Sequence, residues 1–254
     1  MLSAAQIEQY HADGYVVPDF RMPVPVLEAI KARHAKLLAE HPEHPEFHDY
    51  CPALLDIDVG FLEFCRNDEI LDMVAQVIGA DVALWNSSFF AKPALNGKRT
   101  PWHQDGEYWP IRPLATCTVW LAIDDATPEN GCLRVLRGSH KDRRLRSHHT
   151  SGDTDVTLTQ ELDAGEYDES SAVDLVLQAG QVSLHDVYLL HGSEANRSPR
   201  PRRGMTMRFM PTTSLFDRDL ARRKSEQMKI TDHSARSVFL MRGVDHAGNR
   251  FANA

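Results

Sequence analysis

The chain has 254 residues, of which 42% are hydrophobic and 25% are charged, and its formal net charge is −8. This composition supplies enough apolar side chains for a sizeable core and is unlike that of an intrinsically disordered protein. The acidic balance disfavours nucleic acid and anionic membranes as main partners, because both attract basic surfaces. We therefore expect a folded protein that binds neither of them.

The first 80 residues carry the patterns of three helices. Ser3, with glutamine three residues later, has the spacing of a capping box and predicts a short helix that ends near Gly14. Apolar residues at helical spacing predict a second helix over residues 24–40. Asn67 and Gly79 fit the two ends of a third helix. This part of the chain is thus expected to form a mostly helical flank.

From residue 82 the pattern changes to short strands, separated by turn signals such as "PENG", "QAGQ" and "SPRPRR". In "TCTVWLAID", apolar residues alternate with Thr118 and Trp120, which predicts a strand with one face in the core. The other predicted strands are "VALWNSSFFAKP", "CLRVLRGS", "AVDLVLQ", "VSLHDVYLLH" and "MTMRFMP". Helices followed by many short strands indicate a mainly β protein, a sandwich or barrel with helices packed outside.

We expect one domain over residues 1–254, because no repeat, low-complexity segment or linker interrupts the pattern. Its β core should span residues 82–215. Residues 140–171 are polar and charged without a clear period, which predicts a long loop or lid. Residues 216–254 are expected to form a C-terminal extension, in which "DRDLARRKSEQMK" favours a late helix.

The four cysteines, Cys51, Cys65, Cys117 and Cys132, form no CxxC pair. We expect reduced, partly buried thiols, as in a cytosolic protein. The first residues lack the basic start and apolar run of a signal peptide. No apolar window approaches the ~18 residues that span a bilayer. These features predict a soluble, cytoplasmic protein.

The segment "TPWHQDGEYWP" places His103 and Asp105 two residues apart. On a strand, this spacing points both side chains to the same side. An imidazole and a carboxylate together suit Fe(II), Mn(II) or Zn(II) better than Ca(II) or Mg(II). Two ligands are too few, and His185 and His191, both in "SLHDVYLLHGS", are candidates for the third. Two histidines with one aspartate would form the facial triad of non-heme Fe(II) oxygenases.

Five segments carry a pattern that is more specific together than any one of them alone. They are "QIEQYHADGYVVPDF", "WHQDG", "TVWLAIDDATPENGCLRVLRGSH", "GQVSLHDVYLLHGSEANRSPRPRRGMTMRFMP" and "FLMRGVDHAGN". Over nearly the whole chain, this pattern resembles the phytanoyl-CoA dioxygenase family. The resemblance implies a double-stranded β-helix (jelly roll, cupin-like) core and an oxygenase that uses Fe(II), with 2-oxoglutarate and O2 as co-substrates.

The resemblance also implies the ligands of the iron. His103, Asp105 and His191 match the family's ligand positions, which favours His191 over His185 as the third ligand. Relatives that halogenate carry a small residue in place of the carboxylate. Asp105 therefore implies hydroxylation.

Further residues match positions that bind 2-oxoglutarate in the family. Arg202 lies eleven residues after the last iron ligand, which is the family's spacing for the arginine that binds the distal carboxylate. An arginine fork suits that group, because it donates two parallel charge-assisted hydrogen bonds. Ser193, Trp120 and Asn86 match three other co-substrate positions. Some relatives also use an upstream lysine, for which Lys92 and Lys98 are both candidates.

The sequence says less about the substrate. Glu107, Tyr108 and Trp109 follow the ligands directly, and an acid with two aromatic rings could hold a cationic amine. The loop "HKDRRLRSHH" could close over an anionic group instead. Both features favour a small polar or zwitterionic metabolite over a bulky lipid. Two other functions stay open: a non-catalytic cupin-like metal-binding protein, and a metal-dependent hydrolase or isomerase on the same fold.

Overall fold

The computed structural model describes residues 1–228, 230 and 232–253. Its α-helices are α1 (Ala4–Asp13), α2 (Val24–Glu40), α3 (Leu54–Ile57), α4 (Leu62–Cys65), α5 (Asp68–Ile78) and α6 (Arg218–Met228). Short 3-10 helices are η1 (Pro45–His48), η2 (Val59–Phe61), η3 (Asp105–Glu107), η4 (Pro128–Asn130) and η5 (Glu169–Ser171). Among the described helices, none has both the length and the apolar character that a membrane crossing requires.

The three predicted N-terminal helices are confirmed, and their ends follow from local hydrogen bonds. The Ser3 hydroxyl accepts from the backbone N–H of Gln6, and the Gln6 side chain accepts from the backbone N–H of Ser3. Helix α1 ends at Gly14, whose φ of 85° is the left-handed conformation that glycine adopts without strain. The Asn67 side chain accepts from the backbone N–H of Ile70 and caps α5.

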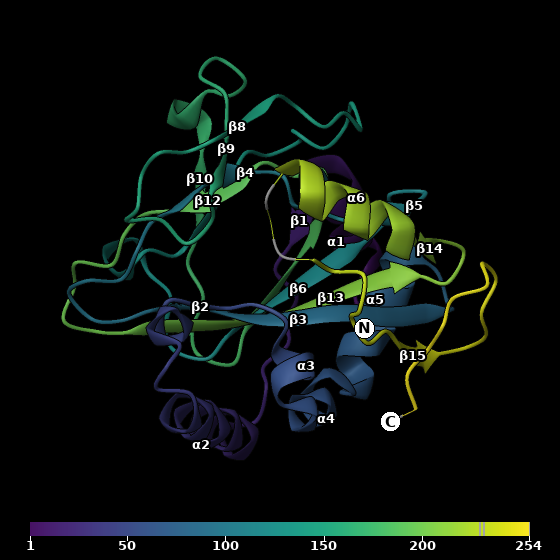
Figure 1. The fold of residues 1–254 in the computed structure, drawn as a ribbon, viewed down its shortest axis with the longest axis horizontal. Coiled ribbons are helices and arrows are strands. Elements are labelled where there is room, and N and C mark those ends of the chain that lie inside the picture. The colour runs from purple at the N-terminus through teal and green to yellow at the C-terminus, as the bar shows by residue number, and fades with distance from the viewer. Residues whose placement is uncertain (229, 231, 254) are drawn as a thin grey trace.

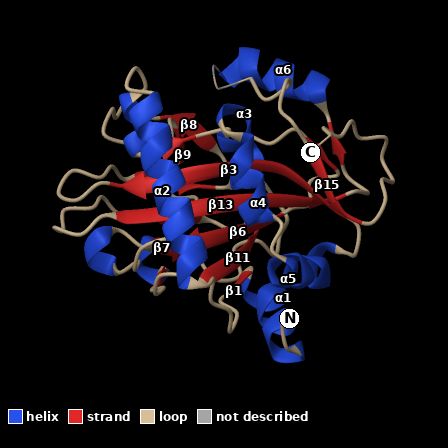
Figure 2. Ribbon diagram, turned by 90° about the horizontal axis from the view of Figure 1, so that it is seen from below, coloured by secondary structure: helices blue, strands red, loops and turns tan. Residues whose placement is uncertain are grey.

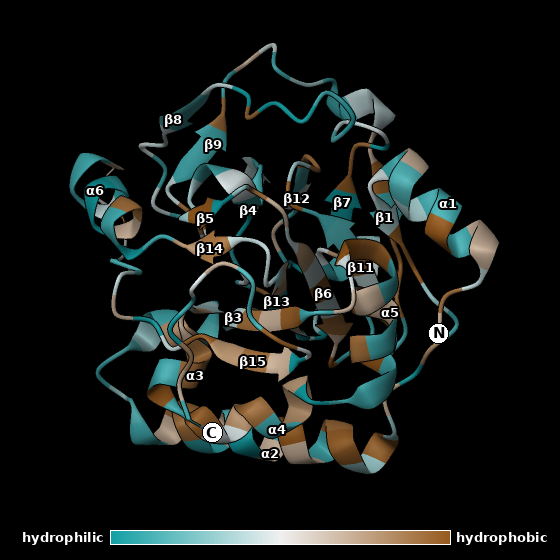
Figure 3. Cartoon of the chain, turned by 90° about the vertical axis from the view of Figure 1, so that its right-hand side faces the viewer, coloured by the Kyte–Doolittle hydropathy of each residue, from teal (hydrophilic) through white to brown (hydrophobic). Residues whose placement is uncertain are grey.

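The largest sheet is antiparallel and forms the middle layer of the molecule. Its strand order is β1 (Tyr15–Val16), β11 (Val182–Asp186), β6 (Cys117–Ala122), β13 (Arg202–Pro211), β3 (Val82–Lys92) and β15 (Phe239–Arg242), with β2 (Tyr50–Cys51) also paired to β3. Figure 2 shows α2 and α4 lying across one face of this sheet. The apolar sides of these helices pack on the sheet and form the main core with it (Figure 3).

A smaller antiparallel sheet lies on the side of the large sheet away from α2 and α4 (Figure 1). Its order is β10 (Val173–Leu175), β7 (Leu133–Val135), β12 (His191–Ser193) and β4 (Thr100–His103). Two strand pairs complete the described secondary structure: β14 (Leu215–Phe216) with β5 (Ile111–Arg112), and β8 (His148–Thr150) with β9 (Gln160–Leu162). The fold is therefore mainly antiparallel β with a helical N-terminal flank.

The alternation predicted for β6 is confirmed and decides what lies between the sheets. Val119 and Leu121 belong to the main core on the helical side. Thr118 and Trp120 point to the opposite side and line a cavity beneath the smaller sheet. A single strand thus supplies both core and cavity wall, because successive side chains of a strand face opposite ways.

Three predictions about the later elements need correction. The run "VSLHDVYLLH" is two strands, because a turn after Asp186 sends β12 into the smaller sheet. Residues 140–171 carry the β8–β9 pair and η5 rather than only loop. The C-terminal segment contributes β15 to the large sheet, so part of it belongs to that sheet. The late helix is confirmed as α6, and Lys229, the last residue predicted for it, lies outside the described residues.

Candidate metal centre and adjoining cavities

The predicted metal ligands meet at one point between the two sheets. His103 ends β4 and His191 begins β12, and the two residues face each other across this antiparallel pair. One ligand atom from each of His103, Asp105 and His191 lies within 4.8 Å of the others, and all three residues are buried. The HxD segment is not one continuous strand. The strand ends at His103, and Asp105 reaches the same point from η3.

Both histidines have their ring orientation and tautomer fixed by the backbone. Nδ1 of His103 lies 2.8 Å from the carbonyl oxygen of Pro101, and Nδ1 of His191 lies 3.0 Å from that of Leu189. A carbonyl oxygen only accepts, so each Nδ1 carries the proton and each Nε2 keeps a free lone pair. A metal-binding histidine needs this arrangement, in which the second nitrogen donates to a fixed acceptor.

The Asp105 carboxylate lies close to His103 and Thr118. Its Oδ1 lies 3.7 Å from Nε2 of His103, while its Oδ2 accepts from the Thr118 hydroxyl at 3.3 Å. Burial acts to raise the pKa of Asp105, but the nearby imidazoles of His103 and then His185 hold that pKa well below its usual value. The carboxylate is therefore ionised at neutral pH, as a metal ligand must be.

His185, the rival third ligand, lies beside the three residues. Its Nε2 is 3.6 Å from Oδ2 of Asp105, and its ring centroid is 4.9 Å from that of His191. Neither of its ring nitrogens has a hydrogen-bond partner in the described part of the chain. Two imidazoles with free Nε2 atoms and one carboxylate fit a divalent transition metal such as Fe(II). The geometry favours His191 in this set, with His185 as a neighbour of the carboxylate.

An inner cavity extends from these ligands to Arg202, Ser193 and Trp120. Arg202 is 2% exposed, and no carboxylate of the described residues lies within 4.0 Å of its nitrogens. It donates to the backbone oxygens of Gly131 and Phe90 and, at 3.4 Å, to the Ser193 hydroxyl. Burial lowers the pKa of Arg202 to about 10, so its guanidinium group is still charged at neutral pH. A buried guanidinium without a carboxylate suits an anionic ligand.

Trp120 forms the wall next to this arginine. The guanidinium carbon of Arg202 lies 5.3 Å from the centroid of the Trp120 ring, within the range of a cation–π contact. The indole ring fits only because residue 204 is glycine, since a Cβ atom there would lie 2.1 Å from the ring. Gly204 on β13 therefore leaves room for the Trp120 ring beside Arg202.

An outer pocket of about 250 Å³ adjoins the inner cavity. Phe90, Asp105 and Arg208 line both spaces. The wall of the outer pocket includes aromatic side chains from three segments, Tyr50, Trp85, and the neighbours Tyr108 and Trp109. The wall also includes Thr157, Leu158 and Thr159 from the β8–β9 connection, and Ile230, His233 and Arg236 from the segment after α6. The candidate metal centre thus lies at the junction of two spaces of different character.

Comparison with known proteins places this site in a family. The family model for phytanoyl-CoA dioxygenase (PhyH) matches residues 1–204 of the chain. The chain belongs to the phytanoyl-CoA dioxygenase family. Members of this family are 2-oxoglutarate-dependent non-heme iron dioxygenases, and the His–Asp–His group fits the iron that they use.

Particular relatives and structures give the extent of the similarity. A "Phytanoyl-CoA dioxygenase domain-containing protein 1 homolog" from Dictyostelium discoideum is 32% identical over 174 residues, which are 66% of this chain and 61% of that protein. The match thus covers about three fifths of that relative. The solved structure "non-heme monooxygenase; ThoJ apo" aligns with a TM-score of 0.77 at 24% identity, covering 98% of this chain and 87% of the other. The structure of EvdO2 from Micromonospora carbonacea var. aurantiaca with 2-oxoglutarate aligns with a TM-score of 0.69 at 20% identity, covering 83% and 91%.

Some of the residues predicted for the co-substrate lie elsewhere in this family member. Asn86 lines the outer pocket and not the inner cavity. Lys92 is buried and donates to the backbone oxygen of Lys98, while Lys98 donates to that of Thr154 at 3.3 Å. Neither lysine lines the inner cavity. Arg202 with Ser193 is therefore the cationic and hydroxyl pair that the structure brings to that space.

The residues predicted for the substrate are divided as well. Tyr108 and Trp109 line the outer pocket, but Glu107 lines neither space. The Trp109 ring is already in cation–π contact with Arg208, whose guanidinium carbon lies 5.4 Å from the ring centroid. An amine held by Glu107 and Trp109 therefore finds no support in this geometry.

Gln104, the residue between the two HxD ligands, is a structural link that sequence reasoning missed. Its amide nitrogen donates to the backbone oxygens of Arg144 and Tyr188 at 3.0 and 2.8 Å. Its amide oxygen accepts from the backbone N–H of Arg146 at 2.7 Å. The Gln104 backbone N–H in turn donates to Nε2 of His148 in β8, at 3.2 Å. The metal turn is thus tied to the segment that leads into β8.

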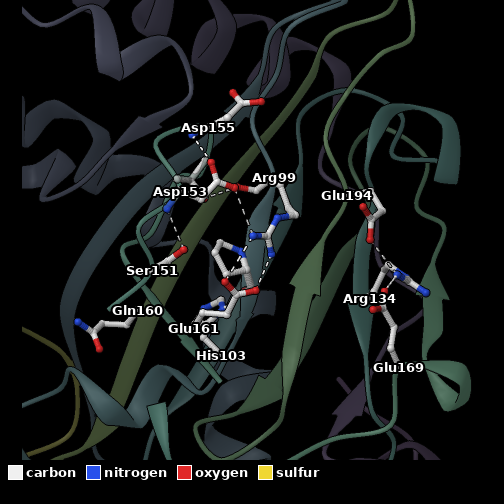
Figure 4. Close-up of polar contacts among 12 residues, drawn as sticks. Arg99, His103, Arg134, Ser151, Asp153, Asp155, Gln160, Glu161, Glu169 and Glu194 are labelled. Carbon is white, nitrogen blue, oxygen red and sulfur yellow. Dashed lines mark hydrogen bonds and ion pairs between the residues drawn. The ribbon is translucent and has the colours of Figure 1, made fainter. Parts of the chain in front are cut away.

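The β8–β9 pair is attached to β4 by charged groups as well. Arg99, which precedes β4, contacts Glu161 of β9 at 2.7 Å and Asp153 at 3.5 Å (Figure 4). Arg208 and Arg236, which line the outer pocket, were also missed. Arg208 lies on β13 six residues after Arg202, on the same side of the strand, and strand periodicity could have indicated it. No comparable signal marks Arg236.

Proposed function

We propose that the protein is an Fe(II)- and 2-oxoglutarate-dependent dioxygenase that hydroxylates a C–H bond of a small molecule and releases succinate and CO2. The observation that carries this proposal is a pairing within one inner cavity. A His–Asp–His group stands at one end, and a buried arginine without a carboxylate partner stands at the other. Family membership supports the same chemistry.

Different residues of the site would have different roles in this reaction. His103, Asp105 and His191 hold the metal, and their fixed tautomers and ionised carboxylate need no rearrangement before binding. Bound iron, with 2-oxoglutarate and O2, supplies the oxidising power. Arg202 and Ser193 orient the distal carboxylate of 2-oxoglutarate. The neighbouring aromatic and apolar walls keep water away from the reacting atoms.

The arrangement of the sheets supports a jelly-roll core. The seven-stranded and four-stranded antiparallel sheets lie in separate layers, and the ligands lie between them. We propose that these sheets form the double-stranded β-helix of the family, within one domain that includes the helical flank. The carboxylate at position 105 supports hydroxylation over halogenation, since it occupies the ligand position that a halide would need.

An anaerobic titration tests the proposal. Purified apoprotein is loaded with Fe(II), and 2-oxoglutarate is added while the visible metal-to-ligand charge-transfer band is recorded. We expect a band in the wild type and none in Asp105→Ala. In Arg202→Gln the band should require at least about 10-fold more 2-oxoglutarate, because a charge-assisted hydrogen-bond pair is lost. The matched control is Arg200→Gln, an exposed arginine two residues away that should titrate like the wild type.

The alternative functions predict other outcomes. A metal-dependent hydrolase or isomerase, or a non-catalytic binding protein, would bind iron without the band and would form no succinate. Substrate screening scored by succinate then identifies the hydroxylated compound. Iron binding without a band in the wild type would refute the proposal.

A further inference from the structure

The outer pocket contains buried hydrogen-bond donors that the protein itself does not satisfy. Arg208 and Arg236 are each 4% exposed, and Trp85 is 1% exposed. In the described part of the chain, no partner is found for Nε of Arg208, for Nε and Nη1 of Arg236, or for Nε1 of Trp85. Nδ1 of His233 is also buried without a partner there. All five nitrogens belong to residues that line the same pocket.

In the described part of the chain, the arginines of this pocket form no ion pair. No carboxylate of the described residues lies within 4.0 Å of either arginine. Asp105 is the one acidic residue in the described wall, and its carboxylate faces the metal ligands. Burial lowers the pKa of Arg236 to about 10, so the group stays charged at neutral pH. Burial likewise lowers the pKa of His233, to about 3, so this imidazole is neutral there.

A buried, unpaired guanidinium group is unfavourable, because it loses hydration without gaining a counter-charge. Two such groups facing one space lower the stability of the folded protein unless a ligand supplies the missing acceptors. The arginines are also held in place before any ligand arrives. Arg208 donates to the Ser88 hydroxyl at 2.8 Å and stacks near Phe90 and Trp109, and the guanidinium of Arg236 lies 6.0 Å from the Trp85 ring.

We propose that the primary substrate is a small organic acid, whose carboxylate is bound by Arg208 and Arg236 and whose carbon skeleton packs against Trp85 and Trp109. This inference rests on the proposed function for its reaction, but the binding site stands on the pocket alone. The volume of about 250 Å³ lies below the roughly 300–1,000 Å³ typical of sites for drug-sized ligands, which favours a compact acid. Because Asp105 lines the same pocket, the skeleton of such an acid lies next to the metal ligands.

A binding titration separates acids from neutral analogues. The probes are phenylacetate, 3-phenylpropanoate and 4-phenylbutanoate, each compared with its primary amide by ligand-observed NMR. Saturating 2-oxoglutarate is present, so that the Arg202 cavity is not available to the probes. We expect at least one acid to bind the wild type at least about 10-fold more tightly than its amide. Arg208→Gln and Arg236→Gln should each lower the affinity for that acid by about 10-fold or more and leave the affinity for the amide unchanged.

Controls distinguish binding from structural roles. Arg242→Gln removes a partly exposed arginine of β15 that pairs with Asp72, and it should bind the acid like the wild type. Removing an unpaired buried charge should leave the thermal midpoint of Arg236→Gln at or above that of the wild type, whereas a structural arginine would lower it. Absence of binding by all three acids, equal binding of acid and amide, or unchanged acid affinity in both pocket variants would each overturn the inference.

The proposed function fails by a different result. If the wild type binds the acid but shows no charge-transfer band with Fe(II) and 2-oxoglutarate, the anion site is supported and the proposed dioxygenase is refuted. If the wild type shows the band but binds no acid, the proposed dioxygenase is supported and the anion site is refuted.

Discussion

The link made by Gln104 gives a stability prediction that can be worked from the structure. Gln104 is 0% exposed, and its side chain makes three hydrogen bonds, to Arg144, Tyr188 and Arg146. Gln104→Ala leaves these three backbone groups without partners. Each unsatisfied group costs roughly 1 kcal/mol or more, so we expect a loss of about 3 kcal/mol in the free energy of unfolding. For a chain of this size, that corresponds to a fall of roughly 6–12 °C in Tm.

Equilibrium urea denaturation and calorimetry measure this loss. Gln227→Ala, in the exposed part of α6, is the matched control and should stay within about 0.5 kcal/mol of the wild type. Gln104→Glu keeps the acceptor for Arg146 but loses both donors, so it should be destabilised at least as much as Gln104→Ala. Hydrogen exchange should also rise in the β8–β9 segment of both Gln104 variants. A Gln104→Ala protein as stable as the control would show that the amide does not link the two segments.

Three further predictions concern other parts of the molecule. His34 is stacked on Phe89, with ring centroids 4.0 Å apart, and burial lowers its pKa to about 4. As pH falls, the His34 imidazole is protonated at a higher pH in the unfolded chain than in the folded protein. The free energy of unfolding therefore has its full value above pH ~6.5 and falls by roughly 2 kcal/mol from pH 7 to pH 5. In urea titrations, His34→Leu should lose this part of the pH dependence, and an unchanged slope would contradict it. All four cysteines are buried and free, and burial raises the pKa of each thiol. A thiol reagent should therefore label the protein only after unfolding, and rapid labelling of the native protein would show that a thiol is accessible. Arg99→Ala should speed hydrogen exchange in β8 and β9 while changing global stability by less than about 1 kcal/mol, since its ion pairs are partly exposed. Unchanged exchange would show that the ion pairs do not hold the segment.

Local patterns were enough to predict several elements. Helix ends followed from Ser3, Gly14 and Asn67, whose side chains or backbone conformation act within a few residues. The alternation in β6 also placed Trp120 on the face away from the core, where it lines the inner cavity. These predictions succeeded because the physical cause lies within the segment itself.

The turn between His185 and His191 was not predicted from the sequence. The Asp186 side chain accepts from the backbone N–H of Tyr188 at 2.8 Å, and the backbone N–H of Leu189 donates to the Asp186 carbonyl at 3.1 Å. An aspartate that binds the backbone two residues on is a known turn signal. The apolar run that follows concealed it. As a result, the two histidines approach Asp105 from different sheets rather than from one strand.

The outer pocket depends on contacts that no local pattern contains. Arg236 and His233 lie after α6, more than 120 residues from the HxD segment, and no periodicity connects them to it. Tyr50 reaches the same pocket from the N-terminal flank. Which of many arginines becomes buried is decided by the packing of these distant segments. A single sequence therefore predicts the metal ligands better than it predicts the substrate pocket.

The distribution of charge around the candidate metal centre links the two proposals. Arg202 lies in the inner cavity, Arg236 in the outer pocket, and Arg208 on the wall that they share, while Asp105 is the one carboxylate in the described walls of both spaces. Such a site is balanced electrostatically only when anions occupy both spaces. Since each anion has an arginine of its own, the co-substrate and an acidic substrate do not compete for the same group. Arg202→Gln should therefore weaken 2-oxoglutarate binding and spare the acid, whereas Arg236→Gln should weaken the acid and spare 2-oxoglutarate. If either variant weakened both ligands equally, the two spaces would be a single binding site.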